Sequence, residues 1–85
     1  MADEHDDRHF ASNARERAAS ADERADGEER RAQQADVEAA EASSEEARRA
    51  HLDEARVHRD AANAQRGSAE SQRNTAQSME AHGET

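Results

Sequence analysis

The chain has 85 residues and a formal net charge of −9, with 39% charged residues, 1% aromatic residues and no cysteine or proline. Most of its hydrophobic residues are alanine; the larger ones are Met1, Phe10, Val37, Leu52, Val57 and Met79. This composition argues against a compact monomeric globule, excludes disulfides and thiolate sites, and disfavours nucleic acid and anionic membranes as partners.

The first segment, residues 1–10, is expected to be a flexible acidic tail. His5 and His9 lie four residues apart in it, a spacing that can bind a divalent metal on a helix. A solvated tail is the favoured interpretation, because no later residue supports such a site. The acidic start is unlike a signal peptide, and no apolar run approaches the roughly 18 residues of a membrane span. We therefore expect a cytoplasmic protein.

Residues 11–80 are predicted to be helical, because alanine, arginine, glutamate and glutamine are strong helix formers. From residue 11 to residue 42, positions at alternating steps of three and four are alanine except at Glu28. This seven-residue period is typical of coiled coils. We predict an interaction seam formed by Ala11, Ala14, Ala18, Ala21, Ala25, Ala32, Ala35, Ala39 and Ala42.

Two stripes compete in the second half of the chain, and neither continues the first without a change of register at 43–47. One stripe is small or apolar: Ser43, Ala47, Ala50, Glu54, Val57, Ala61, Ala64, Ser68, Ser71 and Thr75. The other alternates alanine with longer side chains: His51, Ala55, His58, Ala62, Gln65, Ala69, Gln72, Ala76 and Met79.

The predicted fold class is therefore all-α, a long alanine-rich amphipathic helix of coiled-coil type, with disordered termini and a frayed segment at 81–85. Ser43 and Glu46 stand at capping-box spacing. In the alternative, Ser43 and Ser44 make a turn and cap a second helix, and the two segments pack as an antiparallel hairpin. A continuous helix is favoured, because no glycine or proline lies at this point. Gly27 and Gly67 should weaken the helix without ending it.

His51 and His58 lie seven residues apart on one helix face. They are interpreted as exposed or half-buried polar positions on a weak seam; in the alternative, two chains stack these imidazoles and acid weakens their association. Charge pairs four residues apart, such as Glu45 with Arg49, should support the helix. Catalysis requires a concave and partly dry site, which a lone helix or hairpin lacks. We predict no enzyme activity, catalytic residue, cofactor, metal or small-molecule substrate.

The units "ARERAASADERADGEERRAQQAD" resemble the Ala/Arg/Asp/Glu heptad arrays that serve as helical spacers in actinobacterial signalling proteins, and this resemblance covers about residues 11–62. In being alanine-rich, very hydrophilic and free of cysteine and proline, the chain also resembles late embryogenesis abundant proteins and other hydrophilins. The first resemblance implies a helical spacer, and the second implies a protective chain. Neither supplies a functional residue.

The leading functional hypothesis is a non-enzymatic helical protein that associates with itself or with another helical protein through the seam from Ala11 to Ala42. In a conventional coiled coil, leucine in place of Ala25 and Ala32 should strengthen this association. The alternative is a stress-protective hydrophilic chain, disordered when dilute and helical on drying or on contact with clients.

Overall fold

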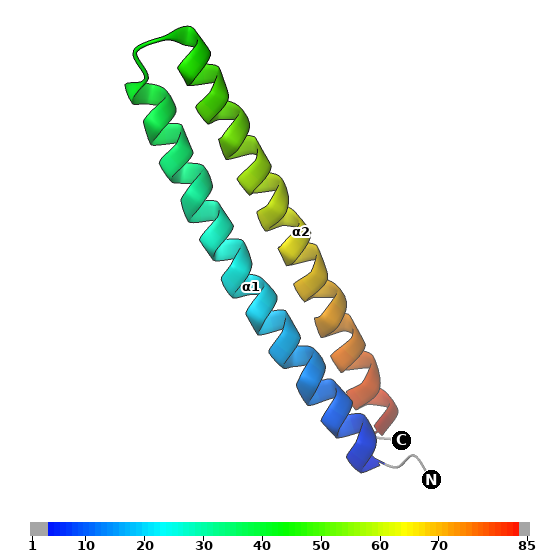
Figure 1. Ribbon diagram of the computed structural model, residues 1–85. Coiled ribbons are helices and arrows are strands. Elements are labelled where there is room, and N and C mark those ends of the chain that lie inside the picture. Colours follow the sequence, from blue (N-terminus) through cyan, green and yellow to red (C-terminus); the bar gives the residue numbers. More distant parts are fainter. Residues whose placement is uncertain (1–3, 84–85) are drawn as a thin grey trace.

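The computed structural model describes the backbone of residues 4–83 and the side chains of residues 8–82. Within this range the chain forms two helices, α1 (Glu4–Glu41) and α2 (Glu45–Gly83), joined by residues 42–44. They run antiparallel and side by side along their whole length (Figure 1). The molecule is 65 Å long and 15 by 12 Å across. The predicted all-α class is confirmed, in the form of a hairpin.

The preference for one continuous helix was wrong, and the reason lies in the register of α2. The stripe that packs against α1 is the one that alternates alanine with longer side chains. At about 100° per residue, a continuous helix would point this stripe roughly 150° away from the α1 seam. A turn between the helices is therefore needed to bring both stripes into one interface.

Of the two serines expected at the turn of a hairpin, Ser43 and Ser44, the second caps α2. The backbone amide of Ala47 donates a hydrogen bond of 3.1 Å to Ser44 Oγ, and the amide of Arg48 donates one of 3.0 Å to the Ser44 carbonyl oxygen. A serine that accepts from the third residue of the helix is a standard N-cap. No residue in the described part of the chain has a positive φ, so this turn requires no glycine.

Alanine alone forms the buried part of the interface among the described side chains. Near the chain ends Ala11 and Ala14 pack with Ala76, and Met79 covers them from the side. Further along, Ala18 and Ala21 pack with Ala69. By contrast, Phe10, Val37, Leu52 and Val57 are largely exposed. Alanine lets two helix backbones approach closely, but it removes little apolar surface from water.

The ends of the helices differ from the expected tail and frayed segment. Helix α1 begins at Glu4 rather than at residue 11, and α2 continues to Gly83. The first turn has the sequence EHDD, and acidic residues there favour a helix start by complementing the helix dipole. Residues 1–3 and 84–85 lie outside the described part of the chain, as does the side chain of His5.

Candidate functional site

The predicted interaction seam lies inside the hairpin. Eight of its nine alanines, all except Ala42, are at most 3% exposed, and Ala42 is half-buried. They face Ala55, Ala62, Ala69 and Ala76 of α2, each at most 1% exposed. Eight of the nine predicted seam residues thus pack against the second helix of the same chain. The small or apolar stripe of α2 remains mostly exposed.

One edge of the interface is closed by four ion pairs, each formed between α1 and α2. Arg15 binds Glu80 through two hydrogen bonds of 2.7 and 2.6 Å, and Arg66 Nη1 lies 3.2 Å from Glu29 Oε2. Asp22 and Asp36 pair with arginines of α2 in the same way. The closed edge comprises Arg15–Glu80, Asp22–Arg73, Glu29–Arg66 and Asp36–Arg59.

The closed edge was not anticipated, although the sequence carries a signal for it. Its members recur every seventh residue on both helices, and reading α2 backwards gives the opposite charge at every step. Positions beside the seam of a coiled coil commonly form such interhelical pairs and set the orientation of the partners. Once an antiparallel hairpin is assumed, this pattern predicts the observed register.

Two histidines of α2 face carboxylates of α1 across the interface. His58 Nδ1 lies 2.6 Å from Glu28 Oε2, and both side chains are about three-quarters buried. This hydrogen bond lowers the pKa of Glu28, and the charge of Arg31 lowers it further. His51 and His58 are half-buried within one chain, as the favoured interpretation predicted. The exception to the alanine stripe, Glu28, is therefore the partner of His58.

Acid should weaken the hairpin through these carboxylates. The hydrogen bond with His58 lowers the pKa of Glu28 below its ordinary value of 4.5, and hydrogen bonds from Arg15 do the same to Glu80. A carboxyl whose pKa is lowered in the folded state stabilises the fold above its ordinary pKa and loses this contribution as the pH falls through the lowered pKa.

We therefore expect the thermal midpoint, measured by circular dichroism, to fall as the pH drops below 4.5. The variant Glu80→Gln should have a lower midpoint than the natural chain at pH 7, and this difference should shrink toward pH 3. A difference that stays constant between the two pH values would show that the Arg15–Glu80 pair does not carry the effect.

The other edge of the interface remains open. It has Arg17, Arg24 and Arg31 on α1, seven residues apart, and only small residues at the facing positions of α2. A shallow groove lies here, and its lining includes Arg24 and Arg31 together with the carboxylates of Glu23 and Glu28 from α1, and Ala61 and Gln65 from α2. By the seven-residue repeat, the facing residues on α2 are Ala61, Ser68 and Thr75. Arg24 donates a hydrogen bond of 3.1 Å to Gln65, and Arg31 pairs with Glu28 of its own helix.

A row of carboxylates runs along the outer face of α2. Glu46, Asp53 and Asp60 lie seven residues apart and are all exposed. Among the described residues, none of the three forms an ion pair with a side chain of its own chain. This acidic row therefore has the same spacing as the three arginines of the open edge and the opposite charge.

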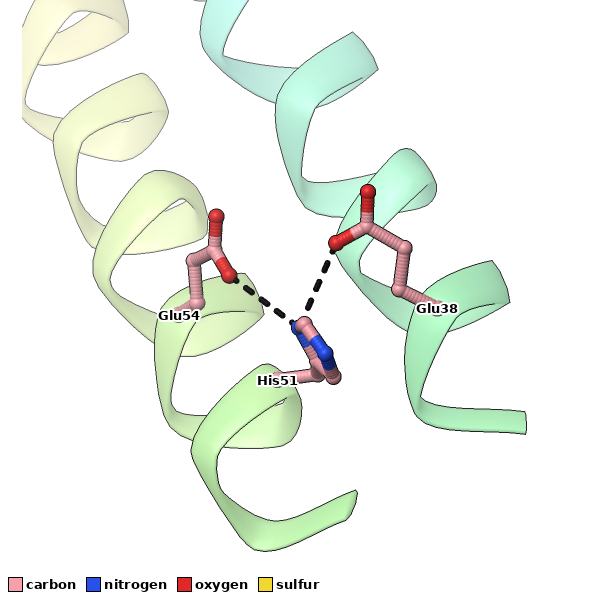
Figure 2. Close-up of side chains that lie close together, drawn as sticks. All are labelled: Glu38, His51 and Glu54. Carbon is pink, nitrogen blue, oxygen red and sulfur yellow. Dashed lines mark hydrogen bonds and ion pairs between the residues drawn. The ribbon is translucent and has the colours of Figure 1, made fainter. Parts of the chain in front are cut away.

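Near the turn, the open edge ends in a cluster of Glu38, His51 and Glu54, shown in Figure 2. His51 Nδ1 lies 3.2 Å from Glu38 Oε2 and 3.4 Å from Glu54 Oε2. The three ligand atoms all lie within 4.8 Å of one another; Glu38 and His51 are partly buried, and Glu54 is exposed. Sequence reasoning missed this cluster because Glu38 belongs to the other helix; the His51-x-x-Glu54 spacing was the available signal.

No protein-family model, curated protein or solved structure matches the chain. Neither helix, over the part of the chain that the structure describes, has a stretch long and apolar enough to cross a membrane.

Proposed function

We propose that the protein is a non-enzymatic helical protein that associates with further copies of itself, the acidic row of one copy lying along the open edge of the next. The observation that carries this proposal is the pair of oppositely charged rows, neither of which meets the opposite charge on the other helix of the hairpin. Arg17, Arg24 and Arg31 have no carboxylate facing them on α2, whereas every carboxylate of the closed edge has an arginine. The two rows share one spacing, so they can align over three successive repeats.

The small residues on the α2 side of the open edge favour the docking of a third helix. Ala61 lines the groove beside Arg24 and Arg31, and a small side chain lets a further helix approach the α2 backbone closely. The incoming α2 helix would present Glu46, Asp53 and Asp60 to the arginines. Charge complementarity of this kind sets the register and the orientation of an association more than its strength.

The two surfaces are different, so the expected association is head-to-tail. An interface between unlike surfaces gives an open chain of subunits unless the rotation between subunits closes a ring. With exposed charges and a net charge of −9 on each copy, association should be weak and dependent on concentration. The mean mass should then keep rising with concentration above the 9.4 kDa monomer, rather than stop at a dimer.

Sedimentation velocity over a concentration series tests this proposal. The variant that reverses the arginines of the open edge, Arg17→Glu, Arg24→Glu and Arg31→Glu, should remain monomeric where the natural chain associates. A control variant with the same change in net charge should associate less strongly than the natural chain but more than this variant. That control carries Arg48→Glu, Arg49→Glu and Arg56→Glu, all at exposed positions outside the open edge.

Mixing two variants with complementary charge reversals tests more specifically whether the two rows contact each other. A second variant, with Glu46→Arg, Asp53→Arg and Asp60→Arg, should also fail to associate alone. Mixed with the first variant, it should form larger species again, because each reversed row then meets its opposite. Monomers at every concentration for the natural chain, or no recovery on mixing, would contradict the proposal.

A stress-protective hydrophilic chain is the second candidate, and one observation favours it. The buried side chains are all alanine among the described residues, so only a small apolar core holds the two helices together when the chain is dilute. Circular dichroism recorded on the same samples distinguishes the two candidates. A coil spectrum in dilute buffer that turns helical only on drying would favour protection, and a helical signal that rises with protein concentration would favour association.

A further inference from the structure

We propose that Glu38, His51 and Glu54 form a zinc site that joins α1 to α2 beside the turn. The cluster combines one imidazole nitrogen with two carboxylate oxygens drawn from both helices (Figure 2). Imidazole and carboxylate are both common ligands of zinc. Calcium, by comparison, takes six to eight oxygen ligands, which three side chains cannot provide. The site is independent of the proposed self-association.

The observed distances suit the coordination geometry of zinc. Bonds of about 2.0 to 2.2 Å in a tetrahedral arrangement place neighbouring ligand atoms about 3.4 Å apart. His51 Nδ1 lies 3.2 Å from Glu38 Oε2 and 3.4 Å from Glu54 Oε2. The two carboxylate oxygens lie no more than 4.8 Å apart. Small side-chain rotations would complete three corners of a tetrahedron, leaving the fourth to water.

The charges of the cluster's own carboxylates favour a cation between them. Glu38 and Glu54 face each other across the interface, and among the described residues their ion pairs are with His51 alone. On the closed edge, each facing pair instead combines a carboxylate with an arginine. Two facing carboxylates repel each other, and a divalent ion between them would turn this repulsion into attraction.

A neighbouring side chain helps to orient one of the carboxylates. Gln34 Nε2 donates a hydrogen bond of 3.3 Å to Glu38 Oε1, and Oε2 faces the imidazole. Groups that hold a ligating carboxylate from behind are a regular feature of metal sites in proteins. Because Glu38 lies one turn before the end of α1 and His51 lies two turns into α2, the ion would fasten the hairpin next to its connection.

Titration of Zn²⁺ into the full chain at pH 7, followed by isothermal titration calorimetry, tests the site. We expect one ion per chain and a higher thermal midpoint with zinc, because an ion that binds the folded hairpin better than the unfolded chain stabilises it. Glu38→Gln and Glu54→Gln should each weaken binding by roughly tenfold or more. Mg²⁺ and Ca²⁺ at the same concentration should leave the midpoint unchanged.

A matched control is provided by His9→Asn, which removes a histidine at the far end of the hairpin. This variant should bind zinc like the natural chain. Loss of binding in His9→Asn, with binding kept in Glu38→Gln, would assign the ion to His5 and His9 and overturn the proposal. An equal rise in midpoint with Ca²⁺, or no zinc binding to the natural chain, would also overturn it.

The imidazole signals in the nuclear magnetic resonance spectrum of the natural chain keep the test decisive if a variant fails to fold. Zinc should shift the His51 signal, assigned in the natural chain from its contacts with neighbouring residues, and leave the signals of His9 and His58 in place. A uniform shift of all histidine signals would show that no specific site exists.

Discussion

Replacing Ala25 and Ala32 together by leucine should destabilise the hairpin by about 2 to 6 kcal/mol, at roughly 1 to 3 kcal/mol for each overpacked position. Both alanines are completely buried between the helices, so no space exists for three further carbon atoms unless the helices move apart. In a chain of this size each kcal/mol corresponds to about 4 to 8 °C of thermal midpoint. The midpoint should therefore fall by about 10 °C or more in circular dichroism.

This sign is the reverse of the one expected for a conventional coiled coil, in which leucine would strengthen the seam. The control is Ala19→Leu with Ala40→Leu, at two exposed positions of the same helix. Leucine and alanine are both good helix formers, so the control should melt close to the natural chain. A raised midpoint for Ala25→Leu with Ala32→Leu would show that the helices do not pack closely at these alanines.

Reversing three arginines of the closed edge should abolish most of the helical pairing at low salt. In the variant with Arg59→Glu, Arg66→Glu and Arg73→Glu, three attractive contacts with α1 become repulsive along one edge. Single exposed pairs stabilise proteins little, but here three act in line on an interface that has only alanine at its centre. Far-ultraviolet circular dichroism should show most of the helical signal lost, with partial recovery at 1 M salt, where the screening length is about 3 Å.

Restoring the complementarity within the same chain should restore the hairpin. Adding Asp22→Arg, Glu29→Arg and Asp36→Arg to the reversed variant exchanges the charges of the three pairs and returns the net charge to that of the natural chain. The control with Arg48→Glu, Arg49→Glu and Arg56→Glu carries the same change in net charge as the reversed variant and should keep most of its helix. Equal loss of helix in the control and the reversed variant would assign the effect to overall repulsion.

The alanine seam was predictable because its signal is local. Within α1, propensity and a seven-residue period specify both the helix and its buried face, and eight of the predicted alanines are buried. The hairpin was harder to predict, because it depends on which of two stripes in α2 is buried. Only the choice of the His51 to Met79 stripe makes a turn necessary, and that choice depends on contacts between residues far apart in the sequence.

In the candidate sites, too, contacts within one helix could be predicted from the sequence, whereas contacts between the two helices could not. His51 and Glu54 share a face of one helix, which the sequence reveals, but Glu38 joins them only through the fold. The closed edge likewise pairs residues up to 65 positions apart. Its charges look scattered along the sequence, and they form pairs of opposite charge only when α2 runs antiparallel to α1. In the turn, Ser43 and Ser44 are chemically equivalent candidates for the cap, and local reasoning could not separate them.

The alanine interface also determines how the protein should respond to temperature. The heat capacity change of unfolding rises mainly with the apolar surface that becomes exposed, and this interface hides little such surface for a helical structure of its length. The stability curve should therefore be shallow, with weak curvature and no marked optimum. Cooling then favours the hairpin through the enthalpy of its helices. The hydrophobic effect weakens in the cold and destabilises many globular proteins, but it contributes little to the stability of this hairpin.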